Sequence, residues 1–352
     1  MRKSLTDSSS PQNRYFVSIH DTSRKGGIES FIRGVLPVIS EKYELISAEP
    51  SRFMNTARGL CGKIIKNTSV RKDFFLFSGV HAALAAYPCL IKNYGLIAYG
   101  SEVNFLTKGY RLSFKKLIMR RILRRAEIIF SISGFTKEKL AECGVDPEKI
   151  VIIKPGPDAV LKIQGSSEKR KGPVLLTVGR LVRRKGHHTV ISALPKIREV
   201  YPDIRYVING DGPERAKLEE LCRSSGVSVN VVFTGITDDR ETEKLYRDAD
   251  IFIMPCFQTS DGDVEGLGLV FLEAGRRGLP VIAGDSGGVP DAVEHGVNGL
   301  LVEPEKHTAT AEAVLKLLSD NDLREKLSEG GVRKSAGFSY TRTAETILEY
   351  TP

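Results

Sequence analysis

The 352-residue chain is too long for one ordinary hydrophobic core and fits two domains of about 150–200 residues each. Its 41% hydrophobic and 27% charged residues are typical of a soluble globular protein, and no run reaches the ~18 apolar residues of a membrane-spanning helix. The net charge of +9 arises wholly within residues 1–160, which carry 26 Lys and Arg against 14 Asp and Glu, so we expect an anionic surface or partner for this half.

Residues 1–12 are polar and lack the apolar segment of a secretory signal, so they are expected to form a disordered leader. Five cysteines are scattered along the chain without a CxxC pair, which argues against a disulfide framework or a zinc site. Free cysteines are typical of a reducing compartment, and we therefore expect a cytoplasmic protein.

Strand-like and helix-like segments alternate from residue 13 to residue 158. The strand "RYFVSIH" is followed by the helical pattern "GGIESFIRGVLPVISE", and further short apolar strands are "YELISAE", "DFFLFSG", "YGLIAYG", "AEIIFSIS" and "KIVIIKPG". Apolar strands separated by helices predict a parallel sheet that is covered on both faces. Residues 13–158 are therefore expected to form one doubly wound domain.

A second series follows the polar, glycine-containing linker predicted at residues 159–172. Its strands, within residues 173–335, are "PVLLTVGR", "IRYVINGDG", "VNVVFTG", "ADIFIMPC", "LPVIAGDSGG" and "NGLLVEP". The fold class is therefore α/β with two Rossmann-like doubly wound domains facing across a cleft. Ligands of such sheets bind beyond the carboxyl ends of the strands, so the residues after each strand are the candidates for a site.

The strand ending at Gly179 is followed by Arg180 and Lys185 just before a helix. Two cations beside a helix N-terminus suit an anion, although a solvated basic loop is an equally good interpretation of this segment alone. Gly210, after the next strand, is by itself more typical of a structural turn.

Glu265 and Glu273 lie eight positions apart, and the residues between them are uncharged. If the helix begins near Gly266, Glu273 lies two turns inside it and the carboxylates lie up to ~12 Å apart along its axis. This distance is too long for one shared metal ion but suits two hydroxyl-bearing groups of an extended ligand such as a nucleoside diphosphate sugar. The alternative is a buried glutamate paired with an arginine such as Arg276. "DGD" at 261–263 is interpreted as a loop, so no metal is implied.

The segments "GRLVRRKG", "GDGP", "EGLGLVFLEAGRRGLPVIAGDSGGVPDAV" and "GVNGLLVEP" resemble, in order and spacing, the nucleotide-binding domain of family 4 retaining glycosyltransferases. "GGIESF", "ISGFTKEKL" and "KPGPD" are similar to landmarks of the family's first half. The resemblance implies the GT-B architecture and a C-terminal helix over 336–352 that crosses back to the first domain. The sequence around Glu265 resembles that of the GDP-mannose-dependent branch of the family, which acts on phosphatidylinositol mannosides and similar lipids.

The resemblance also implies roles for individual residues. Arg180 and Lys185 would neutralise the diphosphate, Glu265 would contact the transferred sugar, and Glu273 would hold the ribose. The other donor-side positions implied by the resemblance are Gly26, Gly27, Gly179, Gly210, Ile236, Gly266, Leu267 and Gly268.

One landmark of the family is different in this chain. Many members have a histidine where this sequence has Tyr99 in "YGSE", and a tyrosine cannot supply imidazole chemistry. Tyr99, Glu102 and His81 are the candidate residues on the acceptor or sugar side.

The segment 108–125 alternates basic and apolar residues at helical spacing. A basic amphipathic helix of this kind favours binding to an anionic membrane, while the alternative is a surface helix whose apolar face belongs to the core. The positive charge of the first half favours the membrane, with Lys115, Lys116, Arg120 and Arg121 as contacts. This places the protein on the inner face of the cell membrane.

These observations together predict a metal-independent, retaining hexosyltransferase that requires no cofactor. It would take mannose from GDP-mannose, or a sugar from a UDP donor, release GDP or UDP, and use a lipid-linked or polysaccharide acceptor. A nucleotide-sugar epimerase of the same fold is the alternative among enzymes. A basic nucleic-acid-binding protein is disfavoured, because the basic half lacks a motif in which aromatic and basic residues alternate.

Overall fold

A computed structural model describes residues 12–20, 26–48, 53–107, 114–158 and 171–352. The chain divides into two units, Met1–Pro155 together with Ser339–Pro352, and Gly156–Phe338. The expected leader and linker lie almost wholly outside the described residues, as do Lys108 and Arg111 of the basic segment. No helix of the described ranges is long and apolar enough to cross a membrane.

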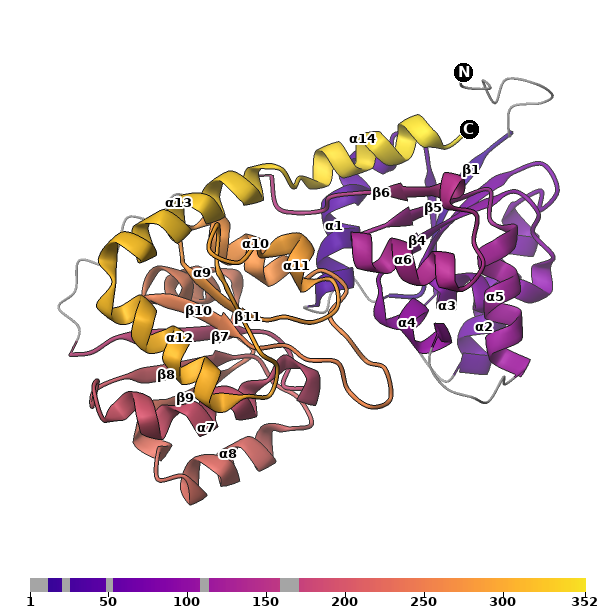
Figure 1. Cartoon of the computed structure of the whole chain (residues 1–352). Coiled ribbons are helices and arrows are strands. Elements are labelled where there is room, and N and C mark those ends of the chain that lie inside the picture. The colour runs from indigo at the N-terminus through magenta and orange to yellow at the C-terminus, as the bar shows by residue number, and fades with distance from the viewer. Residues whose placement is uncertain (1–11, 21–25, 49–52, 108–113, 159–170) are drawn as a thin grey trace. The chain divides into compact units, whose positions relative to one another are not determined.

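The first unit is built on a parallel six-stranded sheet in the order β2-β1-β3-β4-β5-β6 (Figure 1). Its strands are β1 (Arg14–Ser18), β2 (Glu44–Ser47), β3 (Phe74–Ser78), β4 (Tyr94–Ala98), β5 (Ile128–Ser131) and β6 (Ile150–Ile152). Its helices are α1 (Gly27–Ile39), α2 (Phe53–Asn67), α3 (Val80–Ala85), α4 (Ser101–Thr107), α5 (Phe114–Arg125), α6 (Gly134–Glu142) and α14 (Tyr340–Tyr350), with short 3₁₀ turns η1 (Tyr87–Cys89) and η2 (Pro147–Lys149).

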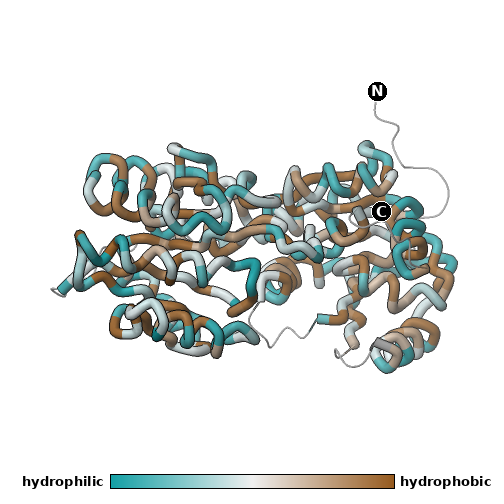
Figure 2. Tube along the Cα trace, turned by 60° about the horizontal axis from the view of Figure 1, so that its bottom comes forward, coloured by the Kyte–Doolittle hydropathy of each residue, from teal (hydrophilic) through white to brown (hydrophobic). Residues whose placement is uncertain are grey.

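Successive strand residues of this sheet point to opposite faces, and each face has its own core. Tyr15 and Val17 belong to the core under α2, α3, α5 and α6, whereas Phe16 between them belongs to the core under α1 and α14. Along the helices hydrophobic and hydrophilic residues alternate (Figure 2), because each helix buries one side only. The C-terminal helix closes its face tightly, since a Cβ on Gly34 of α1 would lie 2.3 Å from the ring of Tyr340.

The second unit is also a parallel six-stranded sheet, in the order β12-β11-β10-β7-β8-β9. Its strands are β7 (Val174–Val178), β8 (Arg205–Asn209), β9 (Val231–Gly235), β10 (Ile251–Met254), β11 (Val281–Gly284) and β12 (Leu300–Val302). Its helices are α7 (His187–Arg198), α8 (Arg215–Ser224), α9 (Asp239–Arg247), α10 (Leu269–Arg276), α11 (Val289–Ala292), α12 (His307–Ser319) and α13 (Asn321–Ala336), with the 3₁₀ turns η3 (Arg183–Lys185) and η4 (Ser228–Asn230). The strand order reverses between β7 and β10, which is where doubly wound sheets bind their ligands.

Arg276 at the end of α10 is buried and fastens α10 to the end of α13. Its guanidinium donates hydrogen bonds to the carbonyl oxygens of Ser335 at 2.6 Å and Phe338 at 2.9 Å. The backbones of Gly275 and Gly331 approach so closely beside it that a Cβ on Gly275 would lie 3.1 Å from the Gly331 carbonyl oxygen. The alternative in which Arg276 pairs with Glu265 or Glu273 is therefore not supported, because the hydrogen bonds of Arg276 fasten it to the C-terminal segment.

Arg276→Ala should lower the free energy of unfolding by about 2–3 kcal/mol, because it removes charge-assisted hydrogen bonds from two buried carbonyls. Urea denaturation followed by circular dichroism measures this change. Arg333→Ala on α13 is the control: its side chain is 68% exposed in a surface pair with Glu329 and should change stability by less than ~1 kcal/mol. Equal stability of both variants would contradict the role assigned to Arg276.

Candidate functional site

Two loops meet beyond the carboxyl ends of β7 and β10, at the reversal of strand order. Gly186, at the end of the first loop, has φ +73°, and a Cβ there would lie 2.2 Å from the carbonyl oxygen of Pro255 in the second. The loop after β11 joins them, because the N–H of Gly288 donates to the carbonyl of Glu265 at 2.9 Å. These close backbone approaches fix where the side chains of the three loops lie.

An ion cluster occupies this position. Lys185 Nζ lies 2.5 Å and Arg184 Nη1 2.6 Å from Oε2 of Glu265, and Arg184 Nε lies 3.1 Å from Oδ2 of Asp263. Burial raises the pKa of Glu265, but the charges and hydrogen bonds of Lys185 and Arg184 outweigh burial and lower this pKa to about 2. Burial also raises the pKa of the neighbouring Cys256 thiol to about 12. Glu265 is thus an ionised, largely buried carboxylate, and Cys256 is a neutral thiol.

Lys185 and Glu265 lie in contact, although the sequence predicted that Lys185 binds the diphosphate and Glu265 the sugar. Sequence reasoning missed two members of the cluster, Arg184 and Asp263. Three adjacent basic residues give no signal of which one points inward, and "DGD" at 261–263 was interpreted only as a loop. Arg180 lies outside the cluster: its side chain is exposed and pairs with none of the described residues. It is therefore available to an incoming anion.

Glu273 lies one turn inside its helix rather than two. The expectation that this helix begins near Gly266 was wrong, because α10 begins at Leu269 and Gly268, with φ +84°, is its N-cap. The carboxylate of Glu273 accepts a hydrogen bond from the hydroxyl of buried Tyr246 at 3.2 Å, and burial raises the pKa of Glu273. Tyr246, about which the sequence gave no signal, positions this glutamate from α9.

The glycines around the cluster have different structural roles. A Cβ on Gly210 would lie 2.0 Å from the carbonyl oxygen of Gly179, so Gly210 lets the β8 loop pack on the β7 loop. The backbone N–H groups of Gly266, Leu267 and Gly268 donate to no other residue that the structure describes. Ile236, just after β9, is 72% exposed, and nothing within the second unit covers its side chain.

The first unit has polar groups at the carboxyl edge of its own sheet. The N–H groups of Val80 and Tyr99 donate to the carboxylate of Glu102 at 3.0 and 3.3 Å, and His81 Nδ1 lies 3.4 Å from the same carboxylate. Tyr99 is buried with its hydroxyl 2.7 Å from Ser78 Oγ, and burial raises its pKa. Tyr99 therefore fills a core position, and the imidazole beside Glu102 belongs to His81, whose side chain is 45% exposed.

A second histidine–carboxylate pair lies at the start of α1. His20 Nδ1 is 3.5 Å from Oε1 of Glu29, and the hydrogen bond from His20 lowers the pKa of Glu29. Gly26 is the N-cap of α1, and a Cβ there would lie 2.2 Å from Oε2 of Glu29, whereas Gly27 has open space around it. Among the described residues, no group of three His, Cys, Asp or Glu side chains is placed to hold a metal ion.

Of the four residues expected to touch a membrane, α5 presents two to solvent. Lys115 and Arg121 are exposed, but Lys116 is 9% exposed with its Nζ 4.5 Å above the ring of Phe105. Arg120 donates to the carbonyl of Leu106 at 2.7 Å. Lys116 and Arg120 therefore hold α4 against α5 and are not surface cations.

Comparison with known proteins identifies a family for the second unit. Residues 161–334 match the family model described as glycosyl transferases group 1. The chain is 36% identical over 241 residues to a GDP-mannose-dependent alpha-(1-6)-phosphatidylinositol monomannoside mannosyltransferase of Mycobacterium tuberculosis, covering 64% of this chain and 63% of that protein. It is 32% identical over 268 residues to a D-inositol 3-phosphate glycosyltransferase of Corynebacterium urealyticum, covering 70% of this chain and 62% of that protein. The chain thus spans less than two thirds of the length of these relatives.

Solved structures share the whole fold at low sequence identity. Anabaena HepE in complex with UDP and glucose has a TM-score of 0.77 at 18% identity, covering 96% of this chain and 98% of that one. Sucrose-phosphate synthase from Thermosynechococcus elongatus has a TM-score of 0.79 at 18% identity over the same shares. The chain therefore has the GT-B fold, and its second unit carries a domain of the glycosyl transferases group 1 family.

Proposed function

We propose that this chain is a retaining, metal-independent hexosyltransferase that uses a nucleotide-sugar donor, with GDP-mannose as the first candidate and a UDP-sugar as the second. The acceptor we propose is lipid-linked or a polysaccharide. The observation that carries the proposal is the ionised carboxylate of Glu265, held by Lys185 and Arg184 where the strand order reverses. The names of the relatives support mannose and a lipid acceptor.

The groups around Glu265 can be assigned to successive parts of an extended nucleotide-sugar donor. The diphosphate would lie near Lys185, Arg180 and the free N–H groups of Gly266 to Gly268, which are the cations and donors available to it. Lys185 and Arg184 are already held in place, so they would stabilise the charge of the leaving nucleotide without rearranging. Glu273, with one carboxylate oxygen bonded to Tyr246, would accept from the ribose hydroxyls.

Lys185→Ala and Arg180→Ala should each lower kcat by about 10²–10³, because each removes a cation that stabilises the leaving diphosphate. Release of GDP or UDP in the presence of donor and acceptor measures the effect. Arg183→Ala is the matched control from the same loop, since the Arg183 side chain is 64% exposed and lies 3.6 Å from Glu305. Wild-type turnover in both Lys185→Ala and Arg180→Ala would contradict the diphosphate assignment, and no nucleotide release by the wild type would favour an epimerase.

Glu273→Gln and Glu265→Gln should have different effects on product binding. Glu273→Gln should weaken the binding of GDP or UDP, because ribose is present in the donor and in the product. Glu265→Gln should leave product affinity unchanged and lower the rate of sugar transfer. Glutamine is preferred to alanine because it still accepts hydrogen bonds from Lys185 and Arg184. Isothermal titration calorimetry measures the affinity of each variant for GDP and UDP. An equal loss of nucleotide affinity in both variants would refute this division of roles.

We further propose that α5 binds the anionic inner face of the cell membrane. Phe114 and Leu117 on this helix are 78% and 54% exposed, and Lys115, Arg121 and Arg125 are exposed around them. Exposed apolar side chains among cations are typical of a helix that lies at a membrane surface. This set replaces the one from the sequence, because Lys116 and Arg120 point inward.

Replacing Lys115, Arg121 and Arg125 with glutamine should release the protein from vesicles that contain phosphatidylglycerol, because each cation contributes about 1 kcal/mol at an anionic surface. High salt should release the wild type in the same way. The control replaces Lys196, Lys217 and Arg223, exposed cations of the second unit, with glutamine and removes the same charge. Vesicle flotation measures binding, and a wild type that never floats, or a control that is released equally, would contradict docking through α5.

A further inference from the structure

The first unit contains a cavity of about 210 Å³ between α3, η1 and α5, away from the residues proposed to bind donor and acceptor. Its inner wall is formed by Phe77, Ala83, Ala86, Tyr94 and Ile122. This volume is below the ~300–1,000 Å³ of a site for a drug-sized ligand, so it does not suit a sugar nucleotide. It suits part of one alkyl chain.

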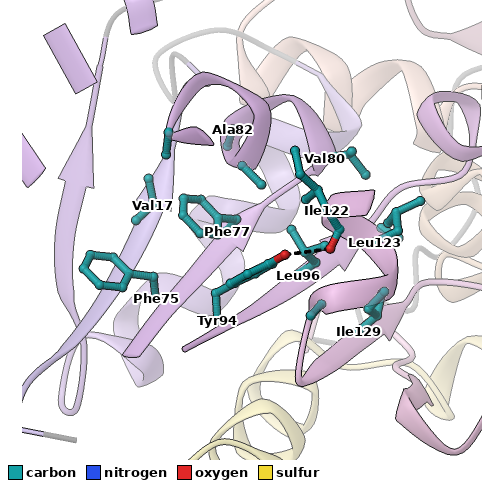
Figure 3. Close-up of a cluster of buried hydrophobic side chains, with 14 of the residues drawn as sticks. Val17, Phe75, Phe77, Val80, Ala82, Tyr94, Leu96, Ile122, Leu123 and Ile129 are labelled. Carbon is teal, nitrogen blue, oxygen red and sulfur yellow. Dashed lines mark hydrogen bonds between the residues drawn. The ribbon is translucent and has the colours of Figure 1, made fainter. Parts of the chain in front are cut away.

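The hydroxyl group in the inner wall of the cavity has a hydrogen-bond partner within the protein. The hydroxyl of Tyr94 donates to the carbonyl of Ile122 at 2.7 Å, and the rings of Phe77 and Tyr94 pack edge to face at 5.9 Å (Figure 3). The apolar inner wall favours apolar guests, because water against it would lack hydrogen-bond partners.

A large apolar side chain at the mouth of the cavity is exposed to solvent. Leu90, directly after η1, is 76% exposed and has φ +54°. This left-handed backbone conformation strains a residue other than glycine and is usually filled by glycine or asparagine. An exposed leucine at a strained position indicates that its side chain contacts another molecule.

Three cations surround the same mouth. Lys92, Arg121 and Arg125 line the cavity, all three are exposed, and none forms an ion pair with any residue that the structure describes. The lining contains no aspartate or glutamate. An apolar cavity with an uncompensated positive rim is complementary to an anionic amphiphile.

We propose that this cavity binds one acyl chain of an anionic membrane phospholipid, whose phosphate rests on Lys92, Arg121 and Arg125. The site is distinct from the acceptor side. Tyr94 begins β4 and Arg125 precedes β5, so the cavity lies toward the amino ends of the strands, whereas Glu102 and His81 follow the carboxyl ends. The bound lipid therefore anchors the protein and is not the molecule that receives the sugar. This inference rests on the proposed docking of α5 at the membrane.

Alkyl phosphates below their micelle concentrations test the cavity without a membrane. The chain contains no tryptophan, so Tyr87→Trp at the mouth provides a single fluorescent reporter in otherwise wild-type protein. Affinity should rise about fourfold for each added methylene from hexyl to octyl phosphate, because each buried methylene contributes ~0.8 kcal/mol. It should level off when the cavity is full, and inorganic phosphate should give no signal. Saturation by inorganic phosphate, or no dependence on chain length, would overturn the proposal.

Two further substitutions in the Tyr87→Trp protein test the contributions of the cavity and of its mouth separately. Ala86→Phe fills the cavity and should remove the dependence on chain length, provided that its thermal unfolding is unchanged. Leu90→Asn keeps the left-handed backbone, removes only an exposed side chain and should weaken octyl phosphate at least tenfold. Val229→Asn, at an 85% exposed valine of the second unit, is the matched control. Unchanged binding in Leu90→Asn, or in a folded Ala86→Phe, would refute the cavity as the site.

Vesicles of phosphatidylglycerol with brominated acyl chains then test the bound lipid itself. Bromine should quench the Tyr87→Trp reporter, and Ala86→Phe should reduce the quenching while the protein still floats with the vesicles. Quenching that Ala86→Phe leaves unchanged would show surface insertion alone and would overturn the acyl-chain site. Sugar transfer to a water-soluble acceptor should be the same in all these variants, so a failure here is distinct from a failure of the proposed transferase activity.

Discussion

The carboxylate of Glu265, buried between Lys185 and Arg184, is the interaction on which the carboxyl edge of the second unit depends. Its partners lie 80 and 81 positions earlier in the chain and reach it only because β7 and β10 are neighbours in the sheet. Burying any one of these charges alone would be strongly unfavourable, so each requires the other two. The close approaches of Gly186 to Pro255 and of Gly287 to Glu265 are the backbone conditions for this arrangement.

The same cluster would allow the proposed site for a charged ligand to be formed before the ligand binds. Lys185 and Arg184 are desolvated and oriented by Glu265, so the proposed diphosphate would require little reorganisation of either side chain. Glu273 is prepared in a similar way from another side. Tyr246 fixes one oxygen of its carboxylate, and Arg277 holds Tyr246 by stacking 4.5 Å above its ring while pairing with Glu243 at 2.6 Å.

The first unit uses the two edges of its sheet differently. At the carboxyl edge, glutamates hold histidines and backbone N–H groups in a polar arrangement around His81 and Glu102. Toward the amino edge, the last two turns of α5 and the η1 turn leave an apolar cavity with a basic rim. Helix α5 runs antiparallel to the strands and connects these regions, so one helix carries the exposed apolar residues at its start and the rim arginines at its end.

Predictions from the sequence were reliable where local pattern decides the outcome. Apolar strands alternating with amphipathic helices specify two parallel sheets, because strands buried on both faces must be apolar throughout. The glycines after β7, β8 and β10, with the paired glutamates, predicted residues that come together at one edge of the sheet, since the carboxyl ends of parallel strands lie together. The start of α10 was misplaced by three residues because Gly266 and Gly268 are equally permissive, and only the N-cap conformation of Gly268 distinguishes them.

Only the tertiary structure decided which side chains of a run point inward. "RRK" at 183–185 is uniform in charge, and the contact of Arg184 with Asp263 and Glu265 follows from the packing of two distant loops. In the same way, Lys116 and Arg120 look like surface cations until α4 packs on α5 and gives them Phe105 and the carbonyl of Leu106 as partners. The sequence by itself determined the residue types, their periodicity and hence the two parallel sheets. The tertiary structure determined the pairing of charges, because burial and partner distance are properties of segments that meet only in the folded chain.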